Sequence, residues 1–217
     1  MEATITATVY GRTVLPGNWI FQNGDPQKKE PIQLILYHIR IGDRQILIDA
    51  GCDTLPGMVV EDFSSPVMAL SKNNILAEHI TDILITHAHH DHIDGLHHFP
   101  NAKIFIQKDE YLAGSGYFLQ GSSVHTFEQS CTVAGCIEVE KIGGHSIGSC
   151  IAKLEANGKH YVFCGDECYL RVNLQKRIPT ARPYCLANSQ RFVEEFSDRK
   201  YTTLLAHDPL IKNGQIL

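Results

Sequence analysis

The stretch Asp82-Ile-Leu-Ile-Thr86-His87-Ala88-His89-His90-Asp91-His92 joins a short apolar run to a cluster of potential metal ligands. The run 82–86 is typical of a buried strand that ends at the histidines. Residues two apart in an extended chain point to the same side, so His87 and His89 can face one point in space. Asp91 and His92, at the following bend, can face a neighbouring point. Imidazole and carboxylate are ligands of zinc and similar ions, so the stretch predicts a metal site at a strand end.

Two metal ions would need more ligands than this one hexapeptide supplies. Further candidate ligands lie downstream in the chain. His145, Asp166 and His207 each come just after a strand-like segment. Loops at one rim of a rigid scaffold commonly carry function, so we expect these side chains to join the cluster. The alternative is a solvated turn that is rich in histidine by chance, with unrelated polar residues in later turns.

Composition narrows the classes of partner. The chain has 217 residues and a formal net charge of -5, and no Lys/Arg run is longer than Lys28-Lys29, which argues against a nucleic-acid partner. No apolar run approaches the ~20 residues that span a bilayer, so no membrane partner is expected. Seven irregularly spaced cysteines argue against a disulfide framework and favour a cytoplasmic location. The length suits one domain over residues 1–217, and the oligomeric state stays open.

The chain outside the cluster alternates strand-like segments with a few helix-like ones. Gly51–Ser65, with Pro56 and Gly57, is expected to be a loop. We expect strands at Thr4–Tyr10, Gln33–Ile41, Gln45–Asp49, Asp82–Thr86, Lys103–Gln107, Ile137–Ile142, Ser149–Glu155, Lys159–Cys164 and Thr202–Ala206. We expect helices at Pro66–Glu78, Lys108–Ala113 and Pro183–Phe196. This order predicts an α/β fold in which two packed sheets are covered by helices.

The sequence resembles the metallo-β-lactamase superfamily. The resemblance rests on the His-x-His-x-Asp-His signature at 87–92, followed in family order by His145, Asp166 and His207. It implies an αββα sandwich of two mixed sheets flanked by helices, with two divalent metal ions at one edge. Zinc is expected first, with Mn, Fe or Co as alternatives. The implied ligands are His87, His89 and His145 for one ion, Asp91, His92 and His207 for the other, and Asp166 as the bridge.

Within the superfamily, the context is most similar to the N-acyl-homoserine lactonase-like branch. In that branch a tyrosine follows the bridging aspartate by three residues, as Tyr169 follows Asp166, and the last ligand sits in a His-Asp pair, as in His207-Asp208. The resemblance implies a hydrolase that opens a small-molecule lactone by attack of a metal-bridging hydroxide. Tyr169 would donate a hydrogen bond to the developing oxyanion, and Asp91 would protonate the leaving group.

Other functions stay open at this point. A thioester, ester or amide hydrolase of the same superfamily is the nearest alternative, and a non-catalytic metal-binding sensor is another. Two departures from the branch bear on the substrate and the oligomer. Gly143 stands where the family often has proline, and the segment between Gly51 and Thr81, where an acyl-chain pocket and dimer contacts are expected, is short.

Several residues near the signature have two interpretations. Asp49, at a strand end, is expected to orient a ligand imidazole. His90, His97 and His98 are expected on the surface or in support of the ligands. Cys164 is expected in the core, and Cys168 is a weaker candidate ligand. An acyl pocket or ordinary core packing would each account for Met58, Phe63, Met68, Tyr117 and Phe118.

Overall fold

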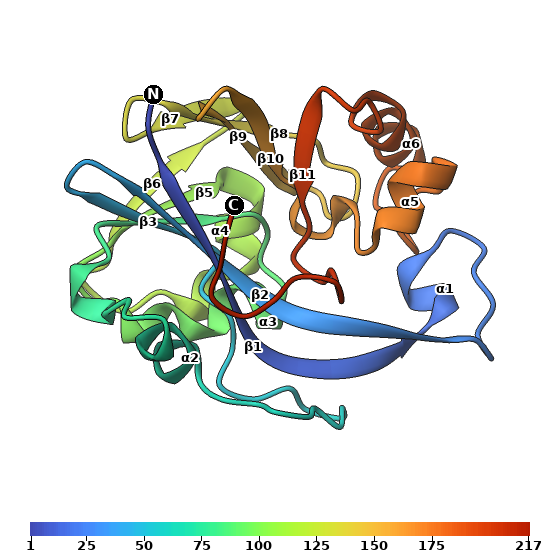
Figure 1. Cartoon of the computed structure of the whole chain (residues 1–217), viewed down its shortest axis with the longest axis horizontal. Coiled ribbons are helices and arrows are strands. Elements are labelled where there is room, and N and C mark those ends of the chain that lie inside the picture. Colours follow the sequence, from blue (N-terminus) through green and yellow to red (C-terminus); the bar gives the residue numbers. More distant parts are fainter.

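The computed structural model describes residues 1–217 and contains two mixed sheets (Figure 1). The first sheet has the order β12-β1-β2-β3-β4-β5-β6, and the second has the order β11-β10-β9-β8-β7. The first contains β1 (Thr4–Pro16), β2 (Lys29–Ile41), β3 (Arg44–Ile48), β4 (Asp82–Ile85), β5 (Lys103–Gln107), β6 (Ser123–Phe127) and β12 (Gln215–Ile216). The second contains β7 (Ser130–Val133), β8 (Ile137–Lys141), β9 (Cys150–Ala156), β10 (Lys159–Phe163) and β11 (Tyr201–Leu204).

Helices are short and lie on the outer faces of the sheets or in the loops between strands. The α-helices are α1 (Gly17–Ile20), α2 (Pro66–Lys72), α3 (His90–Ile93), α4 (Lys108–Ala113), α5 (Arg171–Lys176) and α6 (Leu186–Glu195). The 3-10 helices are η1 (Ala77–His79), η2 (Asp94–His98), η3 (Ser115–Tyr117) and η4 (Gly165–Glu167). No helix combines the length and the apolar character that crossing a lipid bilayer requires.

Strand alternation explains the layers. In β2, Ile35 and Tyr37 face the space between the sheets, whereas Leu34 and Leu36 belong to the cluster on the opposite face, because successive side chains of a strand point to opposite faces. Between the sheets, the ring of Tyr37 meets the ring of Phe163 from β10 at 5.5 Å. This shared core holds the two sheets together.

Helices cover the outer faces. Ala69 and Leu70 of α2 pack in the cluster that also contains the outward side chains of β2, β3, β4 and β5. Phe192 and Val193 of α6 pack against Val162 of β10. The order of layers is therefore helix, sheet, sheet, helix, which confirms the predicted αββα sandwich.

Strand directions place the site. β3, β4, β5 and β6 run parallel, so the carboxyl ends of β3 and β4 meet at one edge of the first sheet. In the second sheet β10 pairs in parallel with β11, and β8 and β10 each pair antiparallel with β9. The segments after β8, β10 and β11 therefore leave the second sheet at one common edge.

Most predicted elements are present, with shifted ends. β2 and β3 form an antiparallel hairpin, and Asn157-Gly158, where both residues have positive φ, forms the turn between β9 and β10. The predicted helix 66–78 ends at Lys72, because Asn74 adopts a left-handed conformation with φ of 59°. β1 runs to Pro16, six residues beyond its predicted end. Sequence reasoning missed α5, β6 and β7, which are short and, in β6 and β7, largely exposed.

Candidate metal centre

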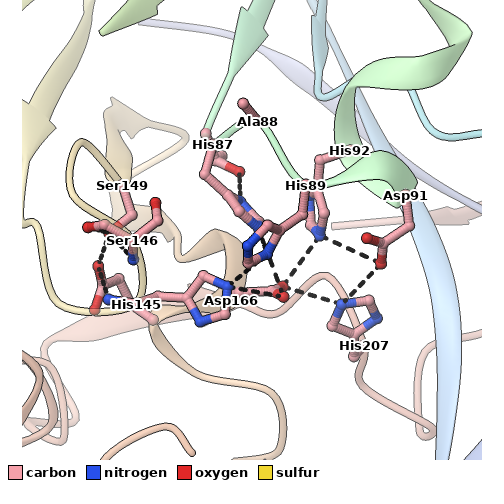
Figure 2. Close-up of polar contacts among 12 residues, drawn as sticks. His87, Ala88, His89, Asp91, His92, His145, Ser146, Ser149, Asp166 and His207 are labelled. Atoms are coloured by element: carbon pink, nitrogen blue, oxygen red, sulfur yellow. Dashed lines mark hydrogen bonds and ion pairs between the residues drawn. The ribbon is translucent and has the colours of Figure 1, made fainter. Parts of the chain in front are cut away.

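The signature begins where β4 ends. His87 is fully buried just after Thr86, and the chain stays extended as far as His89, which precedes the first turn of α3. The turn brings Asp91 and His92 round to the same edge. Figure 2 shows these side chains converging with His145, Asp166 and His207 from the second sheet. The structure thus brings all seven predicted ligands together.

Four donor atoms form a first group, which combines His87, His89, His145 and Asp166. Nδ1 of His89 lies 3.0 Å from Nε2 of His87 and 2.9 Å from Nε2 of His145. Oδ2 of Asp166 lies 3.7 Å from the His87 nitrogen and 3.6 Å from the His145 nitrogen. These separations suit ligands that surround one divalent ion.

The second group combines Asp91, His92 and His207. Oδ2 of Asp91 lies 3.6 Å from Nε2 of His92 and 3.8 Å from Nε2 of His207. The other oxygen of Asp166, Oδ1, lies 3.2 Å and 3.0 Å from the same two nitrogens. Asp166 therefore presents one carboxylate oxygen to each group, as a bridging ligand would.

The hydrogen bonds of Nδ1 in His92 and His207 fix the protonation of Nε2, the ring nitrogen that faces Asp166. Nδ1 of His207 lies 3.0 Å from the carbonyl oxygen of Gln33, which only accepts, so this nitrogen donates. Nδ1 of His92 likewise donates to the carboxylate of Asp49 at 2.8 Å. In the neutral rings each Nε2 then carries no proton, and its lone pair points toward Oδ1 of Asp166. The two Nε2 atoms and this oxygen are all buried without a hydrogen-bond partner. A cation among them fits this donor set.

Electrostatics agree with a cation-binding site. Burial lowers the pKa of His87 well below its usual value and that of His145 to about 4, which leaves both rings neutral and able to ligate. Burial alone would raise the pKa of Asp166, but positive charge on His92 and His207 outweighs it and holds this pKa well below its usual range. The Asp166 carboxylate is therefore ionised. Burial lowers the pKa of these two imidazoles, yet Asp166 raises both above their usual value, so the carboxylate favours positive charge beside it. A bound cation would supply that charge in place of the two protons.

Two buried glutamates that the sequence analysis did not single out hold the ligand-bearing loops. Glu110 of α4 accepts hydrogen bonds from Ala88 N at 2.7 Å, from Ser146 Oγ at 2.6 Å and from Gly148 N at 2.7 Å. It thus ties the signature to the loop that carries His145. No local signal marks this residue, because an acid in the first turn of a short helix is usually exposed.

Glu167 supports the same loop from the other side. Its Oε1 accepts hydrogen bonds from Gly144 N at 3.0 Å and from His145 N at 3.1 Å, and burial raises its pKa to about 7. Gly143, where the family often has proline, has φ of 65° and donates its N–H to Ser149 O at 2.9 Å. Proline can do neither, which explains this departure from the family pattern.

A cavity of about 480 Å³ opens beside the centre. His89, Asp91, Asp166 and His207 form its floor, and Tyr169 borders it with its ring stacked on that of His207 at 4.8 Å. Its wall comes from β1, α1, β2 and the 51–64 loop and consists of Leu15, Trp19, Ile32, Leu34, Leu55, Pro56 and Met58.

Of the five residues for which an acyl pocket and core packing were both open, only Met58 lines this cavity. Phe63 packs against Tyr10, 6.1 Å between ring centres, and Met68 is 57% exposed. Tyr117 and Phe118 belong to the packing under the first sheet. Phe63, Tyr117 and Phe118 therefore follow the core-packing alternative, and none of these four residues lines the cavity. The long β1–β2 hairpin, with α1 between its strands, and the 51–64 loop supply the wall instead.

The remaining assignments are settled by contacts. Cys164 lies in the core as expected, and Cys168 is fully buried in the same cluster, outside both ligand groups. His90 Nε2 lies 2.9 Å from Thr54 O and Nδ1 lies 3.1 Å from the Tyr117 hydroxyl, so His90 braces the loop above the centre.

The family model described as "Metallo-beta-lactamase superfamily" matches residues 36–191, which include the signature, His145 and Asp166 but not His207. The chain belongs to the metallo-beta-lactamase superfamily. A curated relative, the hydroxyacylglutathione hydrolase of Pectobacterium atrosepticum, is 36% identical over 112 residues. That match covers 49% of this chain and 39% of the relative, so this chain matches well under two thirds of the length of that protein.

Solved structures of the superfamily share the whole fold. A variant of B. thuringiensis AiiA with N-decanoyl-L-homoserine at its active site has a TM-score of 0.83 and 20% identity, with 96% of this chain and 95% of that chain covered. AidC, described as a dizinc quorum-quenching lactonase, has a TM-score of 0.76 and 16% identity, with 99% and 93% covered. The AiiA structure therefore holds a small molecule at its active site, and the AidC structure is that of a dizinc lactonase in complex with a product.

Proposed function

We propose that the chain is a dinuclear metal-dependent hydrolase that opens the ring of an N-acyl homoserine lactone. The observation that carries this proposal is the placement of Asp166, whose two carboxylate oxygens each face a separate group of imidazoles. Two divalent ions held there would polarise the substrate carbonyl and activate water at neutral pH. Zinc is the first choice because the similar lactonase AidC is described as dizinc.

The proposed ligands follow the two groups. The first ion would be held by His87, His89 and His145, the second by Asp91, His92 and His207, and Asp166 would contact both. Burial of His87, His92 and His207 restricts water to the cavity side of the centre. Low solvent exposure also strengthens every charge interaction at the site.

Two side chains of the cavity have proposed roles in the reaction. Tyr169 would donate the proton of its hydroxyl in a hydrogen bond to the ester carbonyl oxygen as charge develops there; burial raises the pKa of this phenol well above its usual value, which keeps that proton in place. Ring opening breaks the ester C–O bond and leaves an alkoxide. Asp91, whose side chain is 25% exposed to the cavity, would take the proton of the attacking hydroxyl as the carboxylate product forms and pass it to this oxygen.

The cavity wall favours an acyl chain. Its lining is apolar along β1, β2 and the 51–64 loop and contains no Lys or Arg. An N-acyl chain can bury its methylene groups against such a wall, at about 0.8 kcal/mol for each. Glutathione carries two carboxylates that call for cationic partners, which this wall does not provide.

A thioester hydrolase is the second candidate, favoured by the 36% identity to a hydroxyacylglutathione hydrolase. Metal-loaded protein should be assayed against N-acyl homoserine lactones of several chain lengths, S-lactoylglutathione, a β-lactam and a phosphodiester. We expect the highest kcat/KM for a lactone, rising with acyl length until the wall is covered. A higher kcat/KM for the thioester would replace the lactone proposal, and no turnover of any ester by fully loaded protein would favour a sensor.

His89→Ala tests the metal part of the proposal separately. We expect this variant to lose at least part of the bound metal as well as activity, because His89 Nδ1 lies between two other donors. Unchanged metal stoichiometry would contradict the ligand assignment. Both sheets share one core cluster, so we also infer that residues 1–217 fold as a single unit, which one cooperative unfolding transition would support.

A further inference from the structure

A third cluster of potential metal ligands lies outside the main centre, where η2 meets the start of the 51–64 loop. It consists of Asp53, His97 and His98, and it shares no residue with the two groups above. Nε2 of His97 lies 3.0 Å from Oδ2 of Asp53, and Nε2 of His98 lies 2.8 Å from Oδ1 and 2.9 Å from Oδ2 of the same carboxylate. The imidazoles of His97 and His98 thus both face the carboxylate of Asp53.

The tautomer of His97 is set by its other nitrogen. Nδ1 of His97 lies 2.9 Å from the carbonyl oxygen of Asp94, which only accepts, so Nδ1 carries a proton. In the neutral ring, Nε2 therefore carries no proton, and its lone pair faces an anionic oxygen of Asp53. Either a second proton or a metal ion must lie between them. Donation of the remote N–H to a carbonyl is the usual support of a metal-bound histidine.

Hydrogen bonds also hold the side chains of this cluster in position. The backbone N–H of Asp53 donates to Oδ2 of Asp94 at 3.0 Å, so one residue of η2 fixes both His97 and Asp53. The side chains of Asp53, His97 and His98 are 32%, 44% and 22% exposed, which leaves room for water to complete a coordination shell. Three protein donors and an open position are a common arrangement for zinc.

We propose that Asp53, His97 and His98 form a separate, solvent-facing site for one divalent cation of the zinc type. The site connects η2, which continues the signature helix, to the loop that supplies Leu55 and Met58 to the cavity wall. A metal ion there pins this loop to η2 and holds the wall in place. Because three ligands are partly exposed, it binds its ion more weakly than the buried centre does.

Metal stoichiometry tests this site without an activity assay. Protein free of any polyhistidine tag is loaded with Zn²⁺ and passed through a desalting column, and zinc per chain is measured by elemental analysis. Titration calorimetry with Zn²⁺ then counts weaker sites whose zinc is removed by the column. We expect about three zinc ions for the wild type and about two for His97→Ala and for His98→Ala. His79→Ala, which removes an exposed imidazole on η1, is the matched control and should keep three.

Two results would overturn the proposal. One is a wild type with no zinc bound beyond the main centre up to millimolar Zn²⁺. The other is His97→Ala and His98→Ala variants with unchanged stoichiometry. In both cases a proton bridges the imidazoles and Asp53. The main centre is judged separately by His89→Ala: a protein that lacks the His89-dependent zinc but keeps the His97-dependent one overturns only the proposed function.

Limited proteolysis gives an independent readout of the loop. Zn²⁺ should slow cleavage within residues 51–64 in the wild type and in His79→Ala, and this protection should be lost in His97→Ala. Protection that is equal in all three proteins would show that the loop is held without a metal ion, and it would contradict the role proposed for the site.

Discussion

Oδ2 of Asp49 lies 2.8 Å from Nδ1 of His92, although the two residues leave different strands of the first sheet. Asp49 follows β3 and adopts a left-handed conformation with φ of 60°. Its Oδ1 accepts a hydrogen bond from Thr86 N at 2.7 Å, and Oδ2 also accepts from Thr86 Oγ1 at 2.9 Å. One carboxylate therefore joins the ends of β3 and β4 and sets the orientation of the His92 ring, a predicted ligand.

Asp49→Asn should weaken metal binding by about 10- to 100-fold, because an amide cannot accept from Thr86 N, Thr86 Oγ1 and His92 Nδ1 together. Asparagine tolerates positive φ, so the backbone should keep its conformation. Competition with a chromogenic chelator measures the affinity. Asp43→Asn, in the exposed turn between β2 and β3, is the control, and equal affinities in the two variants would refute the role of Asp49.

Tyr169→Phe should lower kcat by about 100-fold, the usual cost of removing one donor to a developing oxyanion. The phenyl ring can still stack on His207, so the metal content should stay at the wild-type level. Steady-state kinetics with a lactone and elemental analysis check the two parts. Tyr184→Phe, at a 64% exposed position, should leave both unchanged. A wild-type kcat in Tyr169→Phe would remove this residue from the reaction.

Glu110→Gln should lower the free energy of unfolding by about 1–3 kcal/mol, because a buried N–H or hydroxyl donor then faces an amide NH₂. The donors at risk are Ala88 N, Ser146 Oγ and Gly148 N. Chemical denaturation of the metal-loaded protein measures the change. The exposed Glu155→Gln serves for comparison and should differ little from the wild type. If both variants are equally stable, Glu110 does not hold the two loops.

Gly95→Ala should destabilise the protein by at least about 1–3 kcal/mol, the cost of overpacking a tight contact. A Cβ at Gly95 would lie 2.2 Å from the carbonyl oxygen of Ala50, and this contact belongs to backbone that cannot turn aside. Thermal unfolding should show a Tm lowered by several degrees. Gly116→Ala, where a Cβ meets open space, should leave Tm within about a degree. An unchanged Tm for Gly95→Ala would show that the loops can move apart.

Local spacing allowed much of the site to be predicted. The alternation in 87–92 and the strand-like runs before His145, Asp166 and His207 are visible within a few residues of chain, and the structure brings these residues together. The expected contact of Asp49 with a ligand ring is also present. Helix ends were less predictable, because Asn74 ends the helix after Lys72 by a backbone conformation that apolar periodicity does not encode.

The sequence by itself determined the set of ligand-type side chains and the alternating layers of the sandwich, since both depend on side-chain chemistry and on the period of a strand. Only the tertiary structure decided which oxygen of Asp166 faces which imidazoles, and that Glu110 is buried among donors 22 to 38 residues away along the chain. It also decided that the β1–β2 hairpin supplies part of the cavity wall, to which Phe63 and Tyr117 do not contribute. Such contacts join distant segments, and their geometry follows from how the two sheets pack rather than from any local pattern.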